Sequence, residues 1–325
     1  MTPSILDGVA EREVTGQLAP RYHTPVLLRE TIEALNVQPG GRYIDCTLGT
    51  TGHSLAILKA SSPGGQLLGI DADPQAIAIS YTRLSAYRKK SLLINDNFVN
   101  LSDICTKHNF SPVNGILFDF GLSSLQLDTE DRGFSFQHAS PLDMRFDPEQ
   151  AMTASDVVNT FSESDLSSII AEYGEEPRSR QIASQIVASR PLRTTLDLSR
   201  AVLRSTGTRR GKIHPATKTF QALRIAVNHE LDNIGIALAQ TTGLLGFHGR
   251  LVVISYHSLE DRLVKNMMRQ ETRECICPPQ IIQCICGHKS SLRLVHAKAI
   301  RPSDSEVESN PRSRSAKLRT AERVS

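Results

Sequence analysis

The sequence lacks a long apolar run, and no stretch of its 325 residues approaches the length of a membrane-spanning helix. It also lacks a secretory signal, because residues 1–21 mix acidic and small residues instead of a basic start and an apolar centre. We therefore expect a cytoplasmic protein without a membrane partner, with a flexible segment over 1–21. A hydrophobic fraction of 39% and a charged fraction of 22% are typical of a soluble globular protein.

Two well-known glycine motifs are also missing. No Gly-x-Ser-x-Gly elbow accompanies the pair His257-Ser258, which argues against a hydrolase. The turn within residues 43–54 (YIDCTLGTTGHS) follows an expected strand and precedes an expected helix, but it lacks the Gly-x-Gly-x-x-Gly that a pyrophosphate needs. Such a turn suits a nucleotide-like ligand without phosphates, such as S-adenosylmethionine. A nicotinamide dehydrogenase and a purely structural turn are the alternatives.

Acidic and aromatic side chains follow the strands of an expected parallel sheet. Asp71 follows the second strand, 22 positions after Gly49 (71 minus 49), close to the spacing at which an acid meets a ribose hydroxyl. Phe98 follows the third strand and is either core or a ligand contact. Asp119 ends the apolar fourth strand, and we predict that it is functional because burial of an unpaired carboxylate is costly. The expected strands span 43–46, 66–70, 92–94, 115–120 and 251–256.

Aromatic and basic residues alternate in the loop-like stretches 131–136 and 140–146. These stretches suit stacking on unpaired bases, with arginines neutralising the backbone, although a packed loop is the plain alternative. Residues 153–206 show four short helical periods without a clear strand, which predicts a helical insertion. A basic hinge at 208–215, suited to phosphate contact, and a long helix at 214–231 then lead back to the sheet.

Four of the six cysteines form two Cys-x-Cys pairs, Cys275 with Cys277 and Cys284 with Cys286. Four thiolates can form a tetrahedral zinc site, although Cys-x-x-Cys is the commoner spacing. Free or redox-active thiols are an equally good interpretation. The remaining two cysteines occupy expected core positions.

The net charge of +3 conceals an asymmetry along the chain. Residues 289–325 hold nine Lys and Arg against four Asp and Glu. Clustered positive charge of this kind is typical of a phosphate-rich partner, and a solubilising tail is the alternative. The sequence therefore predicts a basic tail.

Several long motifs together resemble one family, the bacterial ribosomal RNA small-subunit methyltransferases H. The matching segments are 22–28 (YHTPVLL), 45–49 (DCTLG), 115–128, 132–136 (RGFSF), 142–145 (LDMR), 173–176 (YGEE), 214–231, 255–262 and 310–319 (NPRSRSAKLR). The resemblance covers residues 22–323. It implies S-adenosylmethionine as the methyl donor and 16S rRNA in the small ribosomal subunit as the partner. The implied acceptor is N4 of a decoding-centre cytosine, nucleotide 1402.

The resemblance also implies a fold class. This is the α/β class I S-adenosylmethionine-dependent methyltransferase fold, which is Rossmann-like, with an inserted all-helical domain. In this chain the methyltransferase domain would comprise residues 22–133 and 214–325, and the inserted substrate-recognition domain residues 134–213. The oligomeric state is left open between a monomer and a homodimer.

The cofactor contacts of the family, carried to matching positions, fall at the strand ends described above. They are Thr51, Gly52, His53, Asp71, Phe98, Asp119 and Gln126. Asp119 is also the candidate catalytic residue, because an acceptor must hold the N–H groups of the amine while the reacting atoms approach to about 3 Å. The turn of the family usually reads Gly-Arg-Gly-Gly-His, so Gly49-Thr-Thr-Gly-His in this chain lacks the basic residue and one glycine.

RNA contacts are predicted from residue type and loop position, with aromatic rings stacking on a splayed base and basic groups on phosphates. The candidates are Arg132, Phe134, Phe136, Arg145, Arg209, Arg210, Lys212, His257, Arg312 and Arg314. A non-catalytic ribosome-binding factor on the same fold is the rival hypothesis, since it would share the basic tail and tolerate the altered turn.

Overall fold

The computed structural model describes residues 24–122, 126–127, 129–206, 214–281 and 283–325. Seven strands form one sheet in the order β3-β2-β1-β4-β5-β7-β6, and β7 runs antiparallel to both of its neighbours. The strands are β1 (Arg42–Asp45), β2 (Gln66–Asp71), β3 (Ser91–Asn95), β4 (Val113–Asp119), β5 (Leu245–Ser255), β6 (Leu292–Leu294) and β7 (Lys317–Arg323). This is the class I methyltransferase order, so the predicted fold class is confirmed.

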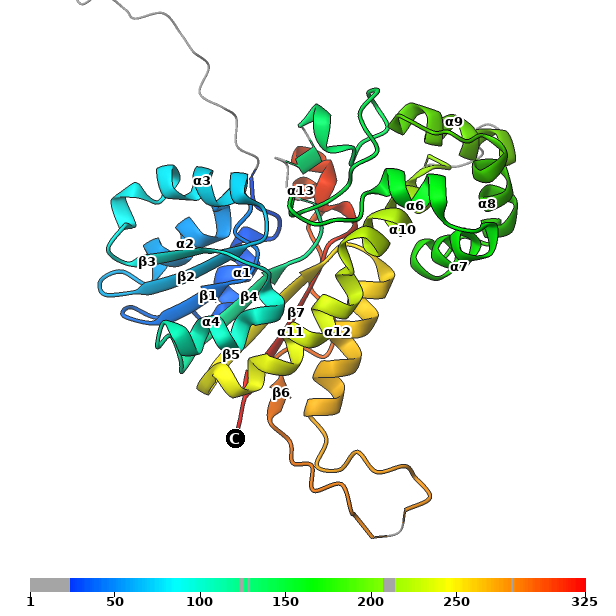
Figure 1. The fold of residues 1–325 in the computed structure, drawn as a ribbon. Coiled ribbons are helices and arrows are strands. Elements are labelled where there is room, and N and C mark those ends of the chain that lie inside the picture. Colours follow the sequence, from blue (N-terminus) through cyan, green and yellow to red (C-terminus); the bar gives the residue numbers. More distant parts are fainter. Residues whose placement is uncertain (1–23, 123–125, 128, 207–213, 282) are drawn as a thin grey trace, which may run out of the picture.

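Both faces of the sheet are buried, because apolar side chains alternate between them along each strand. In β4, Ile116 and Phe118 pack into one apolar cluster and Leu117 packs into the opposite one. One face is covered by α1 (Leu28–Leu35), α2 (Gly52–Ala60) and α3 (Pro74–Arg83), and the other by α4 (Leu101–Lys107), α11 (Glu230–Leu244) and α12 (Ser258–Glu271) (Figure 1). None of the helices in the described ranges is both long and apolar enough to cross a membrane.

A third apolar cluster forms a helical layer between β4 and β5 in the chain, at the right of Figure 1. Its helices are α6 (Ala154–Thr160), α7 (Glu163–Gly174), α8 (Ser179–Ala188), α9 (Thr195–Thr206) and α10 (Thr217–Asn228). The four short helices expected within 153–206 are therefore present. The predicted domain boundaries at 133/134 and 213/214 stay a prediction.

The long helix predicted at 214–231 is interrupted. Helix α10 ends at Asn228, because His229 takes a left-handed conformation with φ 51°, and α11 starts at Glu230. Phe220 and Leu223 of α10 are buried in the helical cluster. Helix α10 therefore packs as part of the inserted helical layer. At the C-terminal end of α10 the chain continues into α11, which covers the sheet.

The prediction of a free basic tail is wrong for much of residues 289–325, because this part of the chain forms strands β6 and β7. Leu318 and Ala321 of β7 are buried in the sheet. The charges beside them are neutralised within the fold, since Lys317 Nζ and Arg319 Nε donate to the carboxylate of Asp261 in α12 at 2.9 and 2.7 Å. These basic residues stabilise the C-terminal strand instead of forming a free positive segment.

Gly133 provides a test of how tightly the loop after β4 is folded. It has a φ of +73°, and a Cβ there would lie 2.3 Å from the Pro141 carbonyl oxygen. We expect Gly133→Ala to lower the free energy of unfolding by about 2 to 4 kcal/mol, measured by urea denaturation. Gly243→Ala is the matched control, because Gly243 lies in α11 with nothing within 4 Å of a Cβ, and it should stabilise by up to about 1 kcal/mol. Equal urea midpoints for the two variants would contradict this account.

Candidate active site

A cavity of about 400 Å³ opens at the carboxyl ends of the parallel strands, the edge at which open α/β sheets bind ligands. Six of the seven predicted cofactor residues line it: Gly52, His53, Asp71, Phe98, Asp119 and Gln126. The seventh, Thr51, is fully buried inside the turn, where its hydroxyl donates to the Thr50 carbonyl oxygen at 2.6 Å. Thr50 faces the cavity in its place.

The turn after β1 is tied to the end of β2. The amide of Gly49 donates to Asp71 Oδ2 at 2.8 Å. Thr51 takes a φ of 66°, which a threonine adopts only at a cost in strain, and a Cβ at Gly52 would lie 2.1 Å from Pro25 Cγ. The turn therefore requires glycine at position 52 for close approach to Pro25 and accommodates threonine at position 51.

The carboxyl group of Asp71 is oriented by two backbone donors. Gly49 N donates to Oδ2 at 2.8 Å and Asp73 N donates to Oδ1 at 2.9 Å. Burial raises the pKa of Asp71 to about 6, and the two hydrogen bonds oppose that rise. Each oxygen has a second lone pair, so this residue can also accept hydrogen bonds from a ligand in the cavity.

Asp119 lies at the end of β4 between Tyr256 and His53. The Tyr256 hydroxyl donates to Oδ1 at 2.8 Å, and Oδ2 lies 3.5 Å from His53 Nδ1. The other ring nitrogen of His53 lies 3.0 Å from the Val26 carbonyl oxygen, so it carries the proton. Burial raises the pKa of Asp119 to about 7, while the Tyr256 hydrogen bond lowers it. This carboxyl group therefore exchanges a proton near neutral pH.

The same cavity extends to the junction of α10 and α11, through polar residues that the sequence analysis did not single out. These are Arg224, Asn228, Glu230 and Asn233. Arg224 forms a bidentate pair with Glu230, at 2.7 Å from Nε to Oε1 and 2.8 Å from Nη2 to Oε2. Its Nη2 also lies 3.9 Å from Glu260 Oε1, so one guanidinium, 12% exposed, faces two buried carboxylates. The feature of the sequence that could have indicated this polar wall is the charged side chain of Arg224 next to the apolar stripe of the predicted helix.

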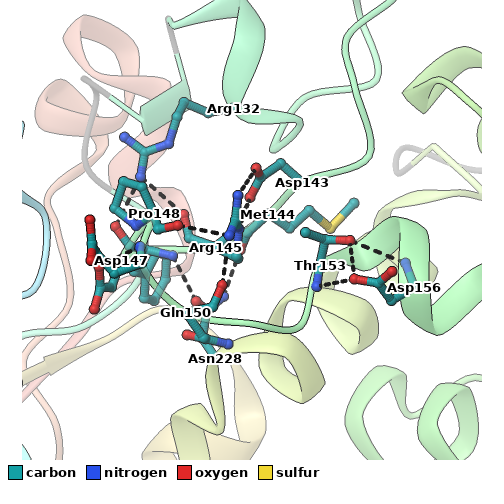
Figure 2. Close-up of polar contacts among 12 residues, drawn as sticks. Arg132, Asp143, Met144, Arg145, Asp147, Pro148, Gln150, Thr153, Asp156 and Asn228 are labelled. Carbon is teal, nitrogen blue, oxygen red and sulfur yellow. Dashed lines mark hydrogen bonds and ion pairs between the residues drawn. The ribbon is translucent and has the colours of Figure 1, made fainter.

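Asn228, also in the cavity wall, joins α10 to the loop after β4 (Figure 2). Its Oδ1 accepts from Phe146 N at 2.8 Å, and its Nδ2 donates to the Met144 carbonyl oxygen at 2.7 Å.

The sequence analysis missed Tyr256 as a contact of Asp119, although Tyr256 directly follows β5 and the strand-end rule covered that position.

Arg132 was predicted to touch RNA, which stays a prediction, and the structure shows that its guanidinium also has partners inside the fold. Its Nη1 lies 3.0 Å from Asp73 Oδ2, and its Nη2 donates to the carbonyl oxygens of Arg145 and Phe146 at 3.0 Å. The Arg132 side chain is 12% exposed and that of Asp73 is fully buried. Arg132 therefore clamps the loop onto the cofactor half of the protein through Asp73, and Figure 2 shows its position beside the loop.

Arg145 has partners within the loop in the same way, and its predicted RNA contact stays a prediction. Its Nε and Nη2 both lie 2.8 Å from the carboxylate oxygens of Asp143, and its Nη1 donates to the carbonyl oxygens of Pro148 and Gln150 (Figure 2). Burial of the Asp143 carboxyl group raises its pKa, but the hydrogen bonds from Arg145 outweigh that effect, so the pKa lies below its ordinary value. The guanidinium groups of both loop arginines are therefore used inside the fold.

The two aromatic candidates of this loop pack within the protein. Phe134 is buried and stacks on Phe146 with ring centroids 5.6 Å apart, so it is not available to a base. Phe136 is half-buried, stacked on His214 at 4.6 Å and edge-on to Phe220 at 5.0 Å. The loop uses its aromatic residues to join the helical cluster, which corrects the base-stacking prediction for Phe134.

The remaining RNA candidates differ in their positions. His257 caps α12 in a capping box with Glu260, so both residues have a structural role at the start of this helix. Arg312 and Arg314 are exposed on the short 3₁₀ helix Pro311–Ser315, and Arg312 also lines the cavity. RNA contact by these two arginines stays a prediction. The basic hinge residues Arg209, Arg210 and Lys212 lie outside the described residues.

Comparison with known proteins identifies the family. The model of the MraW methylase family matches residues 21–324. The chain belongs to the MraW methylase family. A Dehalococcoides mccartyi relative, named ribosomal RNA small subunit methyltransferase H, is 59% identical over 302 residues, which is 93% of this chain and 86% of the relative. A relative of the same name from Thermomicrobium roseum is 52% identical and covers 93% of this chain and 94% of its own length.

Solved structures match this MraW-family methylase only at low sequence identity and with TM-scores below 0.5. A methyltransferase from Streptococcus mutans in complex with SAH has a TM-score of 0.42 and 10% identity, covering 93% of this chain and 100% of that one. Fibrillarin from Aeropyrum pernix with bound S-adenosyl-L-methionine has a TM-score of 0.38 and 8% identity, covering 88% and 67%. Family membership confirms the predicted cofactor, S-adenosylmethionine.

The proton equilibrium of Asp119 can be measured directly. Its carboxyl signal in carbon NMR of aspartate-labelled protein should titrate near pH 7, and Asp119→Asn identifies the signal. Tyr256→Phe removes the donor that lowers the pKa, so the midpoint should move to higher pH. Because the folded-state pKa exceeds the ordinary value, this group stabilises the fold most below about pH 4, and that contribution is lost as pH rises through about 7. A midpoint near pH 4 would contradict the desolvation argument.

The internal role of Arg132 gives a second test. Arg132→Ala leaves the buried Asp73 carboxylate without its cation, so we expect a loss of about 3 kcal/mol in the free energy of unfolding. Arg145→Ala, which breaks a more exposed pair on the same loop, should cost about 1 kcal/mol. Adding Asp73→Asn to Arg132→Ala removes the uncompensated charge and should recover part of the loss. Similar urea midpoints for the two single variants would show that Arg132 is not the buried clamp.

Proposed function

We propose that this MraW-family methylase transfers the methyl group of S-adenosylmethionine to N4 of a decoding-centre cytosine, nucleotide 1402 of 16S rRNA. The observation that carries the proposal is Asp119, a half-buried carboxyl group with a pKa raised to about 7 at the strand end of the cofactor cavity. The name shared by the curated relatives, ribosomal RNA small subunit methyltransferase H, supports small-subunit ribosomal RNA as the substrate.

The residues of the cavity fit the parts of this cofactor. The Asp71 carboxylate, held by Gly49 N and Asp73 N, suits the ribose hydroxyls, which need an acceptor of fixed orientation. Phe98, whose ring packs edge-on to Phe118 with centroids 5.7 Å apart, offers a rigid apolar side for the adenine. Asp119 supplies negative charge for the cationic end of the molecule. When bound, S-adenosylmethionine supplies an electrophilic methyl group on a sulfonium sulfur.

The side chains of this protein then act on the amine. The lone pair of a cytosine N4 is delocalised into the ring, so an acceptor must hold an N–H group and turn the lone pair toward the methyl. Asp119 Oδ2 is suited to that task, because Tyr256 already occupies Oδ1. The nitrogen becomes strongly acidic once the methyl bond forms, so a carboxylate whose conjugate acid has a pKa of about 7 is a sufficient proton acceptor.

The polar α10–α11 junction is the part of the cavity best suited to the base. Asn228 and Arg224 are fixed by their bonds to Met144 and Glu230, so they present a preorganised wall. Arg312 is exposed on its 3₁₀ helix and lines the same cavity, so its guanidinium is placed to contact a phosphate of the RNA backbone. A splayed nucleotide would thus enter between the sheet and the helical layer.

The rival functions make different demands on the same cavity. A nicotinamide enzyme needs a pyrophosphate site, and the turn in this chain places Thr50 and Thr51 where glycines would allow its approach. A non-catalytic ribosome-binding factor requires no titrating carboxyl group in the cavity. Asp119, together with membership of a methylase family, therefore favours methyl transfer.

The test is methyl transfer from labelled S-adenosylmethionine to 30S subunits that lack the modification, followed by mapping of the labelled base. We expect label on N4 of a single decoding-centre cytosine. Asp119→Asn, which keeps the shape but not the negative charge, should reduce the rate at least about 100-fold at saturating cofactor. Tyr256→Phe should shift the pH–rate profile to higher pH, in line with the raised pKa of Asp119.

Two results would overturn the proposal. Label on a different base, or on another atom of the cytosine, would refute the assigned acceptor. Tight binding of 30S subunits without any label would favour the binding-factor hypothesis. An unchanged rate in Asp119→Asn would remove this residue from the chemistry.

A further inference from the structure

The segment between α12 and β6 projects from the end of the sheet (Figure 1), and none of its described residues lines the cavity. None of its described residues, 272–281 and 283–291, is buried. At its base, Ser291 N donates to the Glu271 carbonyl oxygen at 2.9 Å. An excursion of this length without a core of its own needs another source of order, for which proteins use disulfides or metal ions.

Four cysteine sulfurs converge within this segment. Cys275 Sγ lies 3.4 Å from Cys284 Sγ and 3.8 Å from Cys286 Sγ, and the last two sulfurs are 3.5 Å apart. The Cys277 sulfur completes the group, with all four sulfurs within 4.8 Å of one another. Thiolates bound to zinc at about 2.3 Å in a tetrahedron lie about 3.8 Å apart, whereas a disulfide bond is about 2.05 Å long. The cluster therefore has the dimensions of one four-sulfur site.

Backbone N–H groups are directed at these sulfurs. Cys277 N donates to Cys275 Sγ and Ile285 N donates to Cys277 Sγ, each at 3.4 Å. Donors of this kind offset the negative charge of metal-bound thiolates and fix their direction, as outer-shell partners do in metal sites.

Gly287 explains how the second Cys-x-Cys pair turns. It has a φ of +63°, and nothing lies within 4 Å of a Cβ at this position. Glycine is therefore favoured by the backbone conformation and not by crowding. That conformation turns the chain directly after Cys286.

We propose that Cys275, Cys277, Cys284 and Cys286 bind one zinc ion as four thiolates. Four protein ligands close the coordination sphere, so the ion has a structural role and leaves no position open for chemistry. Binding releases the thiol protons to solvent and orders the projecting segment. The ordered segment presents Ile281 and Ile285 to solvent, at 40% and 79% exposure.

The experiment is elemental analysis of the full chain purified in the presence of a reductant. We expect about one zinc per chain, and loss of that zinc in Cys275→Ser combined with Cys284→Ser. Cobalt substitution should give the charge-transfer and visible bands of a tetrahedral thiolate site. His288→Ala is the matched control, since it removes the imidazole nearest in sequence to the four cysteines and should keep both the zinc and the cobalt spectrum.

Limited proteolysis provides an independent readout of the structural role. A zinc chelator should accelerate cleavage within 272–291 in the wild-type chain, and the double serine variant should be cleaved rapidly without chelator. Metal-free protein with four reduced thiols, or with two disulfides by mass, would overturn the proposal. Loss of zinc in His288→Ala would overturn the four-thiolate ligand set. Zinc content does not depend on methyl transfer, so a failed activity assay leaves this result readable.

Discussion

The buried ion pair between Arg132 and Asp73 joins the two halves of this methylase. The Asp73 carboxylate caps α3 through Gln75 N, and the amide of the same residue holds Asp71 at the cofactor strand end. Arg132 adds the loop that leads into the helical layer by bonding that carboxylate and two loop carbonyls. One buried charge pair therefore connects the cofactor side of the cavity with the wall expected to meet the base, and removing either partner leaves an isolated charge.

The strand ends were predictable from the sequence because parallel strands place their carboxyl ends at one edge. That rule identifies Asp71, Phe98 and Asp119, which all line the cavity, from the sequence alone. The charged residues were harder to place. Arg132 has its partner 59 positions earlier in the chain, so composition alone assigned it to RNA and did not reveal its buried partner. The pairing of an arginine is a tertiary property that residue type does not reveal.

The same limitation affected the elements near the C-terminus and the helical layer. Strand β7 contains several basic residues, and its strand character depends on pairing with β5 and on the distant carboxylate of Asp261. The break between α10 and α11 depends on His229 adopting a left-handed conformation, which an uninterrupted apolar stripe does not predict. The polar wall near that break was missed for this reason, although α10 itself was expected.

The sheet order has a consequence for synthesis of the chain. In the described sheet, β6 (Leu292–Leu294) is attached only through β7 (Lys317–Arg323), which pairs with β5 on its other side. The ribosome makes β7 after the other six strands, so the edge of β5 stays unpaired while the cysteine segment and β6 emerge. An unpaired strand edge is a template for association with other chains. The nascent methylase thus depends on its last strand to close the surface that could otherwise lead to aggregation.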